Sequence, residues 1–278
     1  MRIIDGNDML RACIPNTFTT APGEPSWYDK LYPFLEEAEQ WLADNITGDA
    51  VLDSIDETPE ATNNKPLCAR IVTAHALLNA IPSLDLVLTP NGFGIVNTSN
   101  VVPASRDRIE RLLNSVEATR DYAIDSLLFK LPHVNGWLDT QQGRYFAATL
   151  FPRISICRRL NIREHVYDKY LELHERFVKI ENVLAETYFS QEQYEVFRDM
   201  VAKQVATHPM MTHVISRLQS LETMLATDLE VHVQSFYDLV NTIREHEEIF
   251  PEWHSSRTAQ LYSPTVFLNK KESKGYWF

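Results

Sequence analysis

Histidines and carboxylates are the residues in this sequence that could hold a metal ion and activate water. There are nine histidines and 38 acidic residues, but the sequence contains neither HExxH nor the ExxH spacing of di-iron helical bundles. Neighbouring residues on a helix point in different directions, so the dense group Glu245–Glu248 is interpreted as a solvated helix end. The same interpretation applies to Glu172, His174 and Glu175. His75 lies on an apolar helix face and is predicted to be a hydrogen-bonded core or interface histidine rather than a ligand. We therefore predict no metal ligands.

Motifs for cofactor binding and nucleophilic catalysis are also missing from the sequence. The GxG of Asn91–Gly94 has no third glycine after it and stands in a predicted hairpin rather than a strand-to-helix turn. Neither GxSxG nor GxxxxGK[ST] occurs. The three cysteines, Cys13, Cys68 and Cys157, form no CxxC pair and are expected to be reduced, with Cys68 a core thiol. The sequence thus predicts a protein that is not an enzyme and that needs no cofactor.

The charge of the chain is acidic and unevenly placed. The formal net charge is −12, and residues 1–140 carry 20 of the 38 acidic residues but only 10 of the 26 basic ones. A basic footprint for nucleic acid is therefore absent from the chain as a whole. Because no basic residue lies between Lys30 and Lys65, we expect an acidic face that either aids solubility or repels an anion. Its candidate residues are Glu36, Glu37, Glu39, Asp53, Asp56 and Glu57, with Asp44, Asp49 and Glu60 beside them in the sequence.

The C-terminal half is predicted to be built from long helices. No glycine occurs between residues 144 and 274, and glycine is one of the two strong breakers of helix. Apolar residues recur every three or four positions from Val166 to Leu184, which predicts a helix over about 161–188 with one narrow apolar seam. Ser190 and Gln193 form a capping box for a second helix over 191–207. A third helix is expected to begin near Pro209 and to break near residue 227.

The N-terminal half is more interrupted. Apolar periodicity predicts helices over 26–46, 66–81 and 105–130, with a polar loop at 48–65 between the first two. The segment 84–98 is predicted to form two short strands joined by a Pro-Asn-Gly turn. The predicted fold class is therefore mainly α: a helical bundle with long helices in the C-terminal half and a small β-hairpin inserted near 84–98.

The two ends of the chain are predicted to be extended segments. Three consecutive aromatic residues, Tyr276–Phe278, are expected to dock on the protein's own core or on a neighbouring subunit. The hairpin and this tail supply the candidate interface residues, which are Pro90, Asn91, Phe93, Phe267, Tyr276, Trp277 and Phe278. The predicted parts are an arm at 1–25, a helical domain with the hairpin at 26–140, a long-helix domain at 141–250 and a tail at 251–278. We expect no signal peptide, and no apolar run reaches the roughly 20 residues needed to cross a bilayer.

Five short runs carry a resemblance to a known family. They are Leu-Thr-Pro-Asn-Gly-Phe-Gly-Ile-Val at 88–96, Val-Pro-Ala-Ser at 102–105 with Arg-Ile-Glu-Arg-Leu at 108–112, and Asn-Lys-Lys at 269–271 with Lys-Gly-Tyr at 274–276. These runs resemble an uncharacterised family found in phages and prophages of gut bacteria, whose members look like products of the structural gene block. The layout of arm, helical bundle, hairpin and tail is similar to that of head–tail connector proteins, also called adaptor or head-completion proteins.

The resemblance implies a structural virion protein. Connector proteins form a twelvefold ring between the portal and the tail, so the expected partners are other copies of the chain, portal and tail proteins, and DNA only as passing cargo, with no membrane. Synthesis in the bacterial cytoplasm and a final place in the virion follow from the same resemblance. Two alternatives stay open: a monomeric helical module that binds a partner helix, and a less favoured helical metal-dependent hydrolase.

Overall fold

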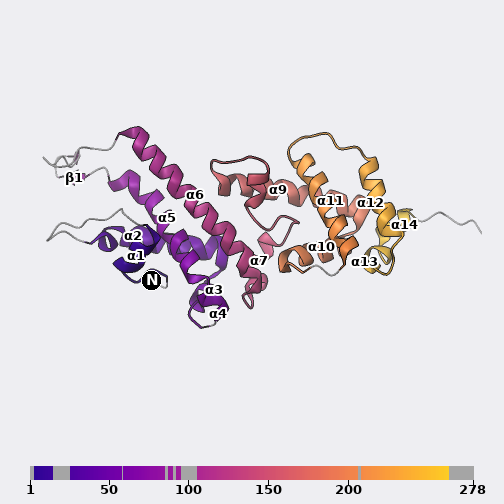
Figure 1. Ribbon diagram of the computed structural model, residues 1–278, viewed down its shortest axis with the longest axis horizontal. Helices are drawn as coiled ribbons and strands as arrows, with labels where there is room; N and C mark the ends of the chain where they lie inside the picture. The colour runs from indigo at the N-terminus through magenta and orange to yellow at the C-terminus, as the bar shows by residue number, and fades with distance from the viewer. Residues whose placement is uncertain are drawn as a thin grey trace, which may run out of the picture. The chain divides into compact units, whose positions relative to one another are not determined.

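The chain is mainly α-helical, as the sequence predicts (Figure 1). The computed structural model describes residues 3–14, 26–57, 59–84, 87–89, 92–94, 105–205 and 208–262. The chain divides into two compact units, an N-terminal unit of Met1–Glu175 with Val201–Lys203 and a C-terminal unit of Arg176–Met200 with Gln204–Phe278. No helix among the described residues is long and apolar enough to cross a bilayer.

Three helices form the centre of the N-terminal unit. Helix α5 packs against both α2 and α6, and it also contacts the short α1 (Figure 1). The helices of this unit before α9 are α1 (Asn7–Cys13), α2 (Trp27–Leu42), α3 (Asp49–Asp53), α4 (Pro59–Thr62), α5 (Lys65–Leu84), α6 (Arg106–Lys130), α7 (Gln141–Phe146) and α8 (Ser155–Arg159). The turns η1 (Ala43–Thr47), η2 (Leu131–His133) and η3 (Trp137–Asp139) connect some of them. Helix α9 (Val166–Leu184) begins in this unit and ends in the other.

The end of α2 explains why the N-terminal unit extends past residue 140. Ser26 and Asp29 form a capping box at the start of α2, and the helix passes at its end into the π turn η1. The Trp137 indole N–H donates to the carbonyl of Ile46 at 3.0 Å, and the Gln142 amide donates to that of Asp44 at 2.8 Å. These bonds attach residues 137–142 to η1, and the contact boundary falls later than the division at 140 that the sequence predicts.

Two short strands lie between α5 and α6. Strand β1 (Val87–Thr89) pairs antiparallel with β2 (Gly92–Gly94), with Leu88 opposite Phe93. The turn between them and the residues on either side of the pair lie outside the described residues. The inserted hairpin over 84–98 therefore stays a prediction.

Parts of the segments predicted to be extended or looped are helical. Residues 7–13 of the expected arm form α1, because Ile3, Ile4 and Leu10 are fully buried and hold this segment on the core. The expected loop at 48–65 contains α3 and α4, since Val51, Leu52 and Ile55 bury one apolar side. The remainder of the arm, residues 15–25, lies outside the described residues.

The first part of the expected C-terminal tail is also helical. Helices α13 (Pro251–His254) and α14 (Arg257–Tyr262) occupy 251–262. The buried Trp253 donates its indole N–H to the carbonyl of Tyr188 at 2.8 Å, and the Tyr262 hydroxyl donates to that of Thr187 at 2.8 Å. These bonds hold the segment on the π turn η4 (Ala185–Phe189), which gives it a fixed helical course.

The C-terminal unit takes its core from the apolar seams that the sequence shows. Its remaining helices are α10 (Gln191–Lys203), α11 (Pro209–Ala226) and α12 (Gln234–Arg244). Ser190 has a φ of 63° after the π turn, and its hydroxyl accepts the N–H of Gln193 at 3.2 Å. One half of the predicted capping box therefore forms. The Gln193 side-chain oxygen instead accepts the N–H of Trp253 at 3.3 Å, which ties α10 to α13.

Replacing Gly143 by alanine is expected to lower the free energy of unfolding by at least about 2 kcal/mol, near the upper range for overpacking. A Cβ at this position would overlap the carbonyl of Trp137 and come within 2.8 Å of the Leu138 Cα. Both obstacles are backbone atoms, so no side-chain rotation relieves them, and the overlap outweighs the better helix propensity of alanine. Urea unfolding followed by circular dichroism measures the change. Gly6→Ala is the matched control, because an added Cβ there meets no atom within 4 Å; equal stability of both variants would contradict the prediction.

Candidate functional site

A pocket of about 620 Å³ lies in the N-terminal unit and carries several polar and charged side chains. One wall is the middle of α6, which contributes Glu117, Asp121 and Tyr122. The opposite wall is the chain from α8 to the start of α9, which contributes Arg158 and His165 among others. Both signs of charge therefore face the same space, an arrangement suited to a small polar ligand or an ion.

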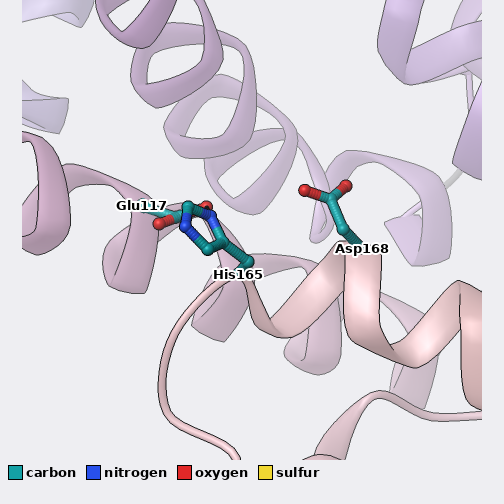
Figure 2. Close-up of side chains that lie close together, drawn as sticks. All are labelled: Glu117, His165 and Asp168. Carbon is teal, nitrogen blue, oxygen red and sulfur yellow. Dashed lines mark hydrogen bonds and ion pairs between the residues drawn. The ribbon is translucent and has the colours of Figure 1, made fainter.

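Three potential metal ligands lie close together, and two of them, Glu117 and His165, line this pocket. One ligand atom from each of Glu117, His165 and Asp168 lies within 4.8 Å of the other two. The shortest separation is 3.1 Å, between His165 Nδ1 and Glu117 Oε1. Figure 2 shows the Glu117 and His165 side chains next to each other, while the Asp168 carboxylate rises from the first turn of α9. Glu117 is partly buried, and the other two side chains are exposed.

The start of α9 fixes the positions of two of these ligands. The carbonyl of His165 accepts the N–H of Lys169 at 2.9 Å, which is the first hydrogen bond of the helix. Asp168 follows His165 by three residues, and residues at that spacing lie on the same side of a helix. The negative charge of Asp168 is also favoured in a first turn, where the helix dipole is positive. The geometry of the helix start thus brings an imidazole and a carboxylate to one edge.

Helix α6 supplies the third ligand and a charged group around it. Glu117, Arg120 and Asp121 share one side of α6. Arg120 lies 3.5 Å from Glu117, and its Nε donates to Asp121 Oδ1 at 3.0 Å. Asp121 is only 4% exposed, and its Oδ2 has no hydrogen-bond partner among the described residues. Burial raises the pKa of Asp121, whereas the positive charge of Arg120 lowers it.

Sequence reasoning overlooked this cluster. His165 and Asp168 form an HxxD pattern, which differs from the ExxH and HExxH patterns of known metal-binding helices. Glu117 is 48 residues from His165, and only the packing of α6 against the start of α9 brings the two together. No sequence pattern could have indicated that contact.

One group of histidine and carboxylates differs from its prediction. Glu172 and Glu175 are exposed as expected, but His174 is 1% exposed rather than solvated. It stacks on Tyr145 with ring centroids 4.2 Å apart. The buried side of α9 is therefore wider than its apolar residues alone indicate, because the aromatic ring of His174 is buried together with them.

Two further core predictions concern His75 and Cys68. The His75 ring stacks on Trp41 at 4.2 Å, and its Nδ1 has no hydrogen-bond partner among the described residues, so packing rather than hydrogen bonding holds it. Burial, together with the charge of Arg120, lowers the pKa of His75 to about 4. Cys68 is a core thiol as predicted, and burial raises its pKa to about 12.

Most of the predicted acidic residues are exposed, and one is not. Glu36, Glu37, Asp53, Asp56 and Glu57 lie at the surface, where Asp56 forms an ion pair with Lys65 at 2.8 Å. Glu39 is 5% exposed and accepts the backbone N–H of Ile3 at 2.9 Å, so it does not belong to an acidic face. The helical period of α2 turns it inward beside Leu35 and Leu42.

The side chains of the candidate interface residues lie outside the part of the chain that the structure describes. The side chain of Phe93 in β2 lies outside the described part of the chain, and the six other candidates lie outside it entirely. These others are Pro90, Asn91, Phe267, Tyr276, Trp277 and Phe278. Their proposed roles remain predictions from the sequence.

Comparison with known proteins gives one similarity. Residues 23–147 are similar to a family of unknown function, DUF6712. This segment covers α2 to α7 and includes Glu117, but it ends before His165 and Asp168. No curated protein and no solved structure matches the chain.

Proposed function

We propose that this chain is a structural virion protein that forms a homo-oligomeric ring, joins the phage head at its portal to the tail and lets DNA pass. The resemblance of residues 88–112 and 269–276 to proteins encoded among phage structural genes is the starting point of the proposal. It assigns the hairpin and the tail after residue 262 to contacts between subunits or with the portal. Twelve copies are expected, since connectors take that order.

The exposed carboxylates of the N-terminal unit are the observation that supports the proposed passage of DNA. Glu36, Glu37, Asp44, Asp49, Asp53, Asp56 and Glu57 are exposed, and no basic residue precedes Lys65 after Lys30. DNA carries about one negative charge per 1.7 Å of its axis. A lumen lined by carboxylates repels the phosphates, so DNA slides without binding.

Electron microscopy of the purified full-length protein over a concentration series tests the ring. Negative-stain images are expected to contain rings with a central hole, and analytical ultracentrifugation is expected to give one large species. Compact monomers at every concentration, also in the presence of portal protein, would contradict the ring and support the monomeric interaction module.

A chain shortened to residues 1–262 is expected to lose the ring but keep its helicity. The cut preserves Tyr262, whose hydroxyl bonds to Thr187 and whose ring lies 6.2 Å from that of Trp253. Circular dichroism therefore measures an unchanged helical signal, while ultracentrifugation measures a shift to monomer. A shortened chain that still forms rings would remove the tail from the proposed interface. A shortened chain that unfolds would show that the tail belongs to the core.

A further inference from the structure

We propose that Glu117, His165 and Asp168 bind one divalent transition-metal ion, with Zn²⁺ as the best-suited common ion. The three side chains come from the middle of α6 and from the start of α9, so the ion would join two segments that are far apart in the sequence. The three ligands all lie within the N-terminal unit, and none of them is among the residues proposed for the ring contacts or for the acidic lumen.

The distances suit a bound ion after a small adjustment. Zn²⁺ binds imidazole nitrogen and carboxylate oxygen at about 2.0–2.2 Å, which places tetrahedral ligand atoms about 3.3–3.5 Å apart. Glu117 Oε1 and His165 Nδ1 are already 3.1 Å apart. The Asp168 oxygen is within 4.8 Å of both and sits on an exposed side chain that can turn toward them.

The buried carboxylate of Asp121 is a second, independent indication of a ligand. It is 4% exposed and lines the pocket, yet its Oδ2 has no hydrogen-bond partner among the described residues. A buried acceptor without a partner is energetically unfavourable. An ion held by three protein ligands keeps water on its open positions, and such water can donate hydrogen bonds to an acceptor in the same pocket.

The arginines near the site each contact other groups. Arg120 pairs with Asp121 at 2.9 Å and with Glu117 at 3.5 Å. Arg158 lies over the Tyr122 ring at 5.4 Å, with Asp125 3.9 Å from its guanidinium. Arg163 also lines the pocket and donates to Asn161 Oδ1 at 3.1 Å, while Glu117, Asp121 and Glu164 supply the negative charge that would attract a cation.

The ligand types determine which ion is favoured. Imidazole nitrogen suits Zn²⁺ and its transition-metal neighbours, whereas Mg²⁺ and Ca²⁺ prefer sites made only of oxygen atoms. One imidazole with two carboxylates therefore favours Zn²⁺ over Mg²⁺. The ion would stabilise the N-terminal unit by linking α6 to the start of α9.

Calorimetric titration of the metal-stripped full-length protein with Zn²⁺ tests the site. We expect one ion per chain, no comparable binding of Mg²⁺, and a rise in the melting temperature of about 5–10 °C at a free Zn²⁺ concentration 100 times the dissociation constant. His165→Asn and Asp168→Asn are expected to weaken this binding at least about tenfold. Asparagine tolerates the positive φ of 49° at position 165, so the backbone is preserved.

His213→Asn is the matched control, because His213 is an exposed histidine on α11 in the other unit. This variant is expected to bind Zn²⁺ as the wild type does. The proposal is overturned if the wild type binds no stoichiometric Zn²⁺, or if both ligand variants bind it with unchanged affinity. Circular dichroism of each variant distinguishes loss of the site from loss of the fold.

Discussion

Replacing Arg198 by methionine is expected to lower the free energy of unfolding of the C-terminal unit by about 3–5 kcal/mol. This is the cost of removing one partner from a buried ion pair. The Glu181 side chain is 0% exposed, and its Oε2 accepts from Arg198 Nε at 2.7 Å. Without the guanidinium, the buried carboxylate would lose this positive partner. Urea unfolding followed by circular dichroism at neutral pH measures the loss.

The double variant Arg198→Met with Glu181→Met separates charge from packing. It is expected to recover most of the lost stability, because apolar side chains of similar volume can replace a buried pair at little cost. Lys169→Met is the control for an exposed pair: Lys169 and Glu172 lie 2.8 Å apart at the surface, and less than about 1 kcal/mol is expected there. A loss below about 1 kcal/mol in Arg198→Met would show that the Glu181 carboxylate is not desolvated.

A second buried carboxylate lies near this ion pair. Glu222 is fully buried and accepts the hydroxyl of Tyr194 at 2.8 Å. Burial raises the pKa of Glu222 well above its ordinary value, and the negative charge of Glu181 raises it further, so both effects favour the neutral form of Glu222. The Arg198 guanidinium, which pairs with Glu181, lies 5.3 Å from the Tyr194 ring.

The helices could be predicted from the sequence because apolar spacing and breakers act locally. The prediction of 105–130 differs from α6 by one residue, and the break expected near 227 follows the end of α11. The two π turns could not be predicted. Their closing bonds join Gly48 to Ala43 and Ser190 to Ala185, both at 2.8 Å, and leave no mark on the apolar period. Each turn is followed by a residue with positive φ, which tertiary packing selects.

The charged residues were harder to predict than the helices. Glu39 and Glu181 are acidic residues in helices rich in surface carboxylates, yet both are buried because another segment supplies a donor. For Glu39 the donor is the backbone of Ile3, 36 residues away. Burial of a charge thus depends on a partner that only the folded chain brings close. The contact between Glu117 and His165 could not be predicted either, because only the folded chain brings these two residues close.

The buried ring of His174 makes the N-terminal unit sensitive to acid. His174 lies between Tyr145 and Tyr170, with ring centroids 4.2 and 5.7 Å away. Burial is the largest influence and lowers the pKa of His174 to about 4, while a hydrogen bond with the backbone of Tyr145 acts in the opposite direction. The unfolded chain binds the proton with a pKa of about 6.5. Between these two values the unfolded state therefore holds more protons than the folded state, and stability falls as the pH falls.

His174→Phe is expected to remove this part of the acid sensitivity. For the wild type, His174 alone accounts for a loss of about 2 kcal/mol between pH 7.5 and pH 5, because protons bind preferentially to the unfolded chain in that window. Phenylalanine keeps the stack on Tyr145 and has no titrating nitrogen, so the variant should match or exceed the wild type at pH 7.5 and lose about 2 kcal/mol less at pH 5. Urea unfolding at both pH values measures the difference. His213→Gln, at an exposed position, should leave the slope unchanged; an unchanged slope in His174→Phe as well would mean that protonation of the buried ring carries no cost.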